Sequence, residues 1–319
     1  MPISNITLNH LNTSEPDFED RLAKLLQRDM IVSDDVTTIV SDILQQVKTR
    51  GDAAVLEYTN QFDFGAESMG DLLVSPELMQ EALDSISNEQ RDALTHAAER
   101  IRAYHEKQKQ GSWTYKEADG SVYGQKISPL KRVGVYVPGG KANYPSSMLM
   151  LAIPAQVAGV KEITATVPTI YGEEGQLVFA AAALAGVTQL YTIGGAQAIA
   201  ALAYGTQTIE KVDKIAGPGN IFVTVAKKLV FGEVGIDMIA GPSELTIICD
   251  GKTNPDWIAM DLFSQAEHDE QAQSILIASD ASFLEEVKRS IDRLLPTMSR
   301  REIICESMSN RGIFIQVKD

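Results

Sequence analysis

The sequence predicts an α/β fold in which parallel sheets are flanked by helices. The main observation is an alternation that starts at Lys131, where four short apolar strands alternate with four helices. This alternation is typical of a doubly wound parallel sheet. The second observation is that glycine-rich turns follow several of these strands. Because the carboxyl ends of parallel strands share one edge of a sheet, we expect a ligand site at that edge.

The part of the chain before this alternation is predicted to be an arm followed by helices. Residues 1–29 have weak hydrophobic periodicity and are expected to form an N-terminal helical arm or small extension. The pattern is helical from Asp34 to about Gln108. Gly51 ends the first helix, and a second helical region begins near Ser75.

Two series of strands and helices follow. The first places strands, with their turns, at 131–140, 161–168, 189–195 and 211–220, and helices at 146–160, 176–187, 196–206 and 222–230. The second begins at Gly241, with strands at 244–250, 272–280 and 312–317 and helices at 254–269 and 282–295. The sequence stops at Asp319, directly after an apolar strand with nothing predicted to cover it, so we expect a carboxy-terminally incomplete chain.

The composition argues against several kinds of partner. The formal net charge of -15 disfavours nucleic acid or an anionic membrane surface, because both are polyanions. No apolar run approaches the length that crosses a bilayer, and the N-terminus lacks the basic region and apolar core of a secretory signal. We therefore expect a cytoplasmic protein that binds neither nucleic acid nor membrane.

Most histidines and both cysteines are predicted to have no part in chemistry. Cys249 and Cys305 lie in apolar runs outside any CxxC pair, so we interpret them as small buried hydrophobic residues. His10, His96 and His105 share no face or partner in the sequence, and we interpret them as surface histidines. The fourth histidine lies in a more informative helix.

The helix at 256–268 has two distinct faces. Apolar residues form one stripe along it: Ile258, Ala259, Leu262, Phe263 and Ala266. Gln265 and His268 lie on another face, close enough in spacing for one metal ion to contact both. An imidazole nitrogen suits zinc, and a neutral amide oxygen leaves the ion electrophilic. The alternative is a solvated histidine at a helix end beside acidic residues.

Four glycine turns each follow a predicted strand, at 137–140, 193–195, 217–220 and 240–243. Such turns let backbone N–H groups approach a ligand closely, and they suit phosphates at helix N-termini. The G-x-G-x-x-G pattern of ordinary dinucleotide-binding domains is absent from the sequence. The turns therefore indicate either a phosphate-bearing ligand or plain strand-to-helix connections, and the pattern alone does not distinguish these two interpretations.

Five segments together resemble the histidinol dehydrogenase family: VGVYVPGG (133–140), IGGAQAIAALAYGT (193–206), VDKIAGPGN (212–220), IDMIAGPSE (236–244) and SQAEHD (264–269). Their order and spacing match as well as their content, and the resemblance runs over nearly the whole chain. The family oxidises L-histidinol to L-histidine through an aldehyde, using two NAD⁺ in succession. Its zinc holds the substrate.

The resemblance implies roles for particular residues. NAD-contacting positions fall on Tyr136, Gln197 and Asn220. A substrate-contacting position falls on Ser243. Zinc ligands that also contact the substrate fall on Gln265 and His268.

The resemblance also implies a domain organisation of two incomplete Rossmann-like domains. One is continuous at 133–240 and contacts NAD. The other is discontinuous and joins 30–132 to 241–319 around the zinc and the substrate, with 1–29 as the arm. Members of the family are homodimers with exchanged tails, so the resemblance implies a homodimer for the complete protein.

One part of the family's pattern is missing. The family has a neighbouring Glu–His pair, in a Pro-Glu-His context, that activates water and shuttles protons, and an Asp and a second His complete its zinc site. No Pro-Glu-His occurs here, and His268 is the only histidine after His105. No catalytic residue is therefore assigned within 1–319, and we expect this chain alone to be inactive.

Two other interpretations stay open at this point. The protein could be a related zinc- and NAD-dependent dehydrogenase that acts on another amino alcohol or on a sulfonate. It could also be a natural short paralogue that binds a nucleotide or a partner without catalysis. An uncovered final strand argues against the paralogue, because proteins normally protect such an edge.

Overall fold

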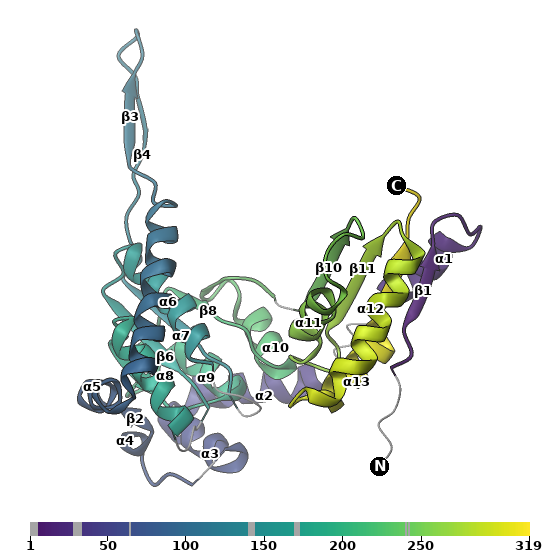
Figure 1. Ribbon diagram of the computed structural model, residues 1–319. Coiled ribbons are helices and arrows are strands. Elements are labelled where there is room, and N and C mark those ends of the chain that lie inside the picture. Colours follow the sequence, from purple (N-terminus) through teal and green to yellow (C-terminus); the bar gives the residue numbers. More distant parts are fainter. Residues whose placement is uncertain are drawn as a thin grey trace. The chain divides into compact units, whose positions relative to one another are not determined.

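The computed structural model contains two compact units. One comprises Met1–Ile31 together with Gly241–Asp319, and the other comprises Val32–Ala240. The residues that the structure describes are 6–27, 34–63, 65–139, 144–168, 173–239, 241 and 243–319. Each unit has a sheet with mainly parallel strands and helices packed against it, so the predicted α/β class is confirmed (Figure 1).

A six-stranded sheet in the order β2-β7-β6-β5-β8-β9 forms the centre of the larger unit. Its strands are β2 (Leu73–Val74), β5 (Arg132–Tyr136), β6 (Glu162–Thr166), β7 (Gln189–Tyr191), β8 (Lys214–Ala216) and β9 (Gly235–Ile236). All neighbouring pairs are parallel except β2 and β7. From β5 the chain adds β6 and β7 on one side and β8 and β9 on the other, so the winding reverses between β5 and β8.

Helices cover both faces of this sheet. Four of them connect its parallel strands: α7 (Pro145–Val157), α8 (Glu173–Leu184), α9 (Gly195–Tyr204) and α10 (Ile221–Val230). The N-terminal helices are α2 (Asp34–Arg50), α3 (Asp52–Phe62), α4 (Met69–Leu72), α5 (Pro76–Ser85) and α6 (Asn88–Glu106). α2 and α3 share one buried core with α9 and α10, and α5 and α6 share another with α7 and α8.

This packing differs from the expected division of the chain, which grouped 30–132 with 241–319. The buried face of α2 shows why: Val40, Ile43, Leu44 and Val47 recur at helical spacing and are buried. The core that they enter also holds residues of α9 and α10. Periodicity identifies which face of a helix is buried, but it does not identify the partner. The structure groups the N-terminal helices with the six-stranded sheet.

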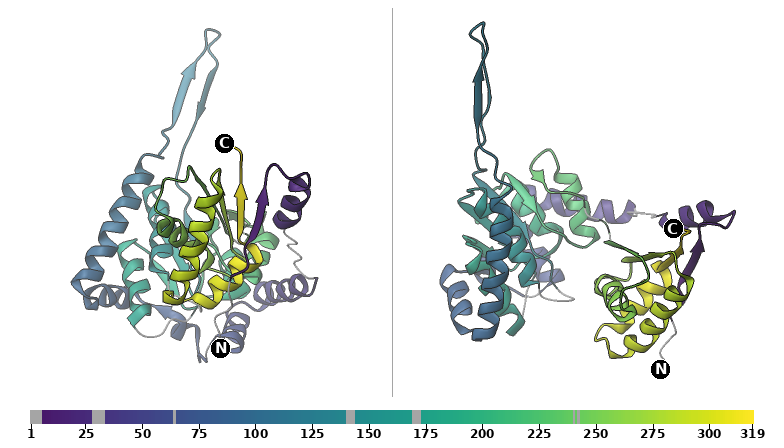
Figure 2. Two further views of the ribbon diagram at one scale, coloured as in Figure 1. Left: turned by 45° about the vertical axis from the view of Figure 1, so that its right-hand side comes forward. Right: turned by 45° about the horizontal axis from the view of Figure 1, so that its top comes forward.

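A hairpin of β3 (Trp113–Lys116) and β4 (Val122–Gln125) is a feature that the sequence analysis did not predict. Every residue of both strands is exposed, and Figure 2 shows the hairpin projecting beyond the end of α6. Trp113, Tyr115 and Tyr123 stack along it, with ring centroids 6.1 and 5.5 Å apart. The contact between Tyr115 and Tyr123, which lie opposite each other, joins the two strands where no core lies beneath them, and Trp113 extends the stack along β3.

The smaller unit is built on a four-stranded parallel sheet in the order β1-β12-β11-β10. Its strands are β1 (Asn9–Asn12), β10 (Glu244–Cys249), β11 (Gln273–Ala278) and β12 (Ile313–Gln316). One face is covered by α11 (Pro255–Ala266), α12 (Ala281–Leu294) and α13 (Arg301–Arg311), with the short 3-10 helix η1 (Leu295–Thr297) after α12. The other face is covered by α1 (Phe18–Leu26).

The expectation that the last strand is uncovered is wrong. β1 pairs with β12 in parallel, with Asn9 opposite Ile313, and β11 flanks the other side of β12. Ile313 and Phe314 are 0% exposed, and the ring of His10 packs edge-on against Phe314 at 5.5 Å. The described part of the predicted arm, 1–29, thus adds a strand and a helix to the sheet. The strand that covers β12 comes from the opposite end of the sequence, and local periodicity cannot reveal such a distant pairing.

Candidate functional site

The carboxyl edge of the six-stranded sheet gathers the predicted cofactor residues. The winding of the sheet reverses between β5 and β8, and open parallel sheets bind ligands in the crevice at such a reversal. Tyr136 is the last residue of β5, and the turn at 217–220 follows β8. The turn at 193–195 follows β7 and opens α9. Two of the predicted glycine turns therefore lie at the same edge as Tyr136.

Tyr136 connects the end of β5 to the turn at 193–195. Its side chain is 3% exposed, and its hydroxyl accepts a hydrogen bond from the Gly195 N–H at 3.2 Å. Burial raises the pKa of Tyr136 to about 12; the Gly195 N–H lowers this pKa and the nearby Asp63 carboxylate raises it. The hydroxyl is therefore neutral at physiological pH and holds the start of α9 next to β5.

The turn after β8 meets Tyr136 through the backbone. Gly217 has a φ of +135°, and a Cβ at this position would stand 2.0 Å from the Tyr136 carbonyl oxygen. Only glycine allows so close an approach. Asn220, at the end of the turn, is exposed and caps α10 by accepting the Val223 N–H at 3.1 Å.

Gln197 lies in the first turn of α9 and is 1% exposed. Its Oε1 would lie 2.6 Å from a Cβ placed on Gly195, so the side chain folds back over the turn at 193–195. Tyr136 and Gln197 consequently meet at one turn, and Asn220 follows the glycine that contacts Tyr136. The structure thus brings the three predicted NAD-contacting residues to a single edge of one unit.

Gln265 and His268 lie at the C-terminal end of α11, where Gln265 is half-buried and His268 is exposed. α11 ends at Ala266, so Gln265 lies in its last turn and His268 lies in the turn that follows, where its N–H donates to the Gln265 carbonyl at 3.2 Å. Ser243 precedes β10 and is exposed, and its carbonyl accepts the N–H of Gln273, the first residue of β11, at 3.0 Å. These residues therefore lie at the amino edge of their sheet, opposite to the edge that the topological rule favours.

The donors at the end of α11 fit part of a zinc site. Imidazole nitrogen is a common zinc ligand, and an amide oxygen is a weaker but compatible one. In the ranges that the structure describes, no group of three or more His, Cys, Asp or Glu could hold a metal ion. Gln265 and His268 would thus supply two ligands, and a complete site needs others.

Gly140, Ala240 and Pro242, which belong to predicted glycine turns, lie outside the described residues.

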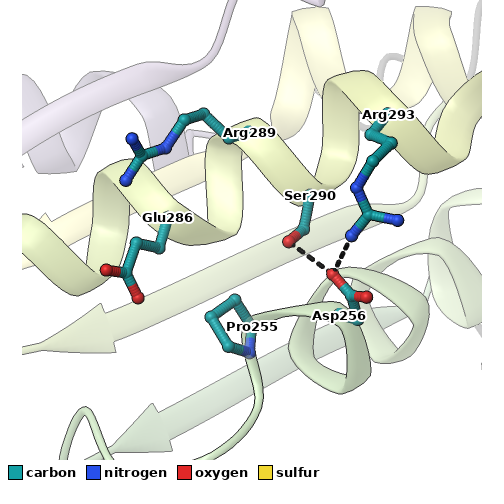
Figure 3. A pocket seen from close by; sticks show the side chains of 6 residues that line it. All are labelled: Pro255, Asp256, Glu286, Arg289, Ser290 and Arg293. Atoms are coloured by element: carbon teal, nitrogen blue, oxygen red, sulfur yellow. Dashed lines mark hydrogen bonds and ion pairs between the residues drawn. The ribbon is translucent and has the colours of Figure 1, made fainter.

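The other end of α11 is fixed by a polar junction with α12. Asn254 caps α11 by accepting the Asp256 N–H at 2.9 Å. The Asp256 carboxylate accepts a hydrogen bond from the Ser290 hydroxyl at 2.6 Å and pairs with Arg293, and both contacts lower its pKa (Figure 3). The pocket at this junction, which neither predicted zinc ligand lines, is formed by Pro255, Asp256, Glu286, Arg289, Ser290 and Arg293. We interpret the junction between Asp256, Ser290 and Arg293 as the contact that sets the position of α11.

Replacing Asn254 by alanine should destabilise the protein by about 1 kcal/mol, because an N–H in the first turn of α11 loses its acceptor. The Asn254→Ser variant keeps an acceptor oxygen and should stay within about 0.5 kcal/mol of the unaltered protein. Urea unfolding followed by circular dichroism measures both. Equal stability of Asn254→Ala and the unaltered protein would show that this cap does not hold the helix.

The remaining histidines and cysteines take no part in these sites. Cys249 and Cys305 are half-buried, and they pack against the core of the smaller unit. His96 is exposed on α6, and the Nδ1 of His105 lies 2.6 Å from the side-chain oxygen of Gln108. These positions agree with packing and surface roles.

Sequence reasoning missed three charged residues beside the cofactor edge. Asp63 follows α3 and approaches the backbone of Gly194; partial burial raises the pKa of Asp63, and the Gly194 N–H offsets part of that increase. Lys227 and Asp237 form a largely buried ion pair next to Gly217. Asp63 and Lys227 lie outside the five segments that carry the resemblance, and Asp237 lies in the segment at 236–244, but no local spacing connects any of them with Tyr136.

Known proteins match this chain over nearly its whole length. A profile of the family described as histidinol dehydrogenase matches residues 26–319. A histidinol dehydrogenase of Pseudomonas aeruginosa is 60% identical over 98% of this chain and 71% of its own length. One of Dechloromonas aromatica is 57% identical over 98% of this chain and 73% of its own length.

A solved structure gives the same result for the fold. The crystal structure of a histidinol dehydrogenase from Elizabethkingia anophelis superposes with a TM-score of 0.89 and is 33% identical. The match covers 99% of this chain and 72% of that one. The matched family profile, the sequence identities and the shared fold agree, and this chain belongs to the histidinol dehydrogenase family.

Proposed function

We propose that the protein oxidises L-histidinol to L-histidine, with NAD⁺ as the hydride acceptor and zinc holding the substrate. The observation that carries this proposal is the 60% identity, over 98% of this chain, to a protein named histidinol dehydrogenase. Oxidation of an alcohol to an acid removes two hydrides and adds one water. The reaction therefore passes through an aldehyde and consumes two NAD⁺.

The carboxyl edge of the six-stranded sheet supports the cofactor part of the proposal. Tyr136, Gln197 and Asn220 would contact NAD there, and NAD when bound supplies the hydride acceptor. Both α9 and α10 begin at this edge, and their first N–H groups favour an anion such as a phosphate. Gly217 lets the turn at 217–220 pack directly against the Tyr136 carbonyl, so the turn that leads to Asn220 lies beside Tyr136.

The end of α11 supports the metal part of the proposal. Gln265 and His268 would hold zinc and contact the substrate, and Ser243 would contact the substrate from the start of β10. Zinc when bound supplies a positive centre that orients the amino alcohol. The exposed imidazole of His268 and the half-buried amide of Gln265 leave both donors accessible to further ligands.

The proposal extends to the state of the complete protein. We propose a cytoplasmic homodimer that binds neither nucleic acid nor membrane. The net charge of -15 supports the last part of this proposal, because it repels polyanions. Among the helices that the structure describes, none is both long and apolar enough to cross a membrane.

A chimera tests the proposed reaction. Residues 1–319 would continue into the C-terminal part of the Pseudomonas aeruginosa relative, which lies outside the 71% of that protein that this chain covers. With L-histidinol, NAD⁺ and zinc, we expect NADH to form in a ratio of two to each L-histidine. A folded chimera that forms no NADH, while the relative turns over in the same assay, would contradict the proposal.

A further inference from the structure

The larger unit contains an ion pair whose lysine is almost completely buried. Lys227 on α10 pairs with Asp237, just after β9, and their side chains are 3% and 30% exposed. Lysine is almost never fully buried unless it is paired, because its charge loses hydration. An ion pair in this position therefore needs hydrogen-bonding partners that offset the loss of water.

Both members of the pair hold the same glycine. Lys227 Nζ donates a hydrogen bond to the Gly217 carbonyl oxygen at 2.7 Å. Asp237 Oδ2 accepts a hydrogen bond from the Gly217 N–H at 2.8 Å. Burial acts to raise the pKa of Asp237, but Lys227 and the N–H groups of Gly217 and Met238 together lower it. The carboxylate is therefore charged and the contacts with Gly217 are charge-assisted, which makes them stronger than neutral hydrogen bonds.

Gly217 is a residue that needs external support. Glycine loses more conformational freedom on folding than any other residue, so its φ and ψ angles must be fixed by contacts with its neighbours. Here it must adopt a φ of +135° directly against the Tyr136 carbonyl. The same turn leads to Asn220 and the start of α10. A shift at Gly217 would move Asn220 relative to Tyr136.

We propose that Lys227 and Asp237 are positioning residues for NAD, which set the turn at 217–220 through Gly217 and do not contact the cofactor themselves. This inference rests on the proposed function, because it takes Tyr136 and Asn220 as NAD contacts. Removing either charge frees the turn, so NAD⁺ binds to a less ordered edge.

A second ion pair in the same unit provides a matched control. Arg132 has a side chain that is 11% exposed, and it pairs with Glu162 and Glu210. It also donates a hydrogen bond to a backbone carbonyl, that of Lys211, at 3.0 Å. Arg132 begins β5, so this pair lies at the amino edge of the sheet, away from the predicted cofactor edge. Its loss should affect stability without affecting the turn.

The experiment measures the NAD⁺ dissociation constant by calorimetry, and urea stability in parallel, for the unaltered chain and three variants. Lys227→Met should weaken NAD⁺ binding by at least about tenfold, as expected when a charge-assisted contact is lost. Asp237→Asn keeps an acceptor oxygen for the Gly217 N–H but loses the charge, so its loss of affinity should be smaller, about threefold or more. Arg132→Met should change the dissociation constant less than about twofold, even if its urea stability falls as far as that of Lys227→Met.

Each outcome decides a specific point. Unchanged NAD⁺ affinity in folded Lys227→Met and Asp237→Asn overturns the inference alone, and so does an equal loss in Arg132→Met. If Lys227→Met fails to fold, Asp237→Asn decides the matter by the same comparison. If the unaltered chain does not bind NAD⁺, the cofactor assignment itself falls, and the inference falls with it.

Discussion

Residues 1–319, expressed alone, should show no measurable oxidation of L-histidinol. Converting the aldehyde hydrate into an acid requires a base that takes up protons and a group that activates water. The Pro-Glu-His context of the pair that the resemblance assigns to these tasks does not occur in this sequence. Gln265 and His268 would also hold zinc without further ligands, so the substrate would be poorly positioned. Loss of positioning alone can cost orders of magnitude in rate.

The measurement compares NADH formation by 1–319 with that of the chimera described above. Both proteins contain Tyr136, Gln197 and Asn220, so the comparison isolates the missing catalytic and zinc-binding groups. Turnover by purified 1–319 within about tenfold of the chimera, a difference of only about 1.4 kcal/mol in activation free energy, would place the catalytic base within this chain. His96 and His105 would then be the first residues to replace.

The structure shows which edge of the smaller sheet presents apolar side chains. The final strand β12 is covered by β1, so it does not present a bare apolar edge. The two edge strands of that sheet are β1 and β10; at β10, Ile248 is 80% exposed, and Trp257 on the neighbouring α11 is 70% exposed. Self-association, if observed, should therefore respond to a polar substitution at Ile248 and not to changes in β12.

The sequence predicted those parts of the fold in which an element packs against elements close to it in the chain. In the first series, each strand leads through a helix to a parallel strand, and β5, β6 and β7 are neighbours in chain order, whereas β8 returns to pair with β5. The N-terminal elements lacked this property. α2 shows a clear buried face but no indication of which helices it packs against. β1 is a four-residue strand, NHLN, with only Leu11 buried, too short to show an alternation.

The candidate cofactor residues could be grouped from the sequence because strands of one parallel sheet end at the same edge. Tyr136, Gln197 and Asn220 follow that rule. Ser243 and the end of α11 do not, because they lie at the amino edge of the other sheet, and no periodic pattern marks such a site. Lys227 and Asp237 were beyond prediction for another reason. Their partner is the backbone of Gly217, and backbone contacts leave no signature in residue type.

His268→Ala should remove zinc and activity together in the chimera. His268 is the only histidine near the end of α11, and the amide of Gln265 alone is a weak ligand. Removing an outer-shell partner of a metal ligand already costs about 10- to 100-fold in affinity, so removing the ligand itself should cost more than about 100-fold. We expect the zinc content, measured after dialysis by atomic absorption, to fall from near one per subunit to near zero.

His96→Ala is the matched control, since His96 is also an exposed histidine but lies within α6. Its zinc content and turnover should equal those of the unaltered chimera. Because the His268 side chain is exposed, its removal should leave urea stability measured without zinc almost unchanged. A loss of activity with full zinc content would mean that His268 acts on the substrate without binding the metal. Unchanged zinc and unchanged turnover in His268→Ala would remove the end of α11 from the active site, because its one strong donor would then have no function there.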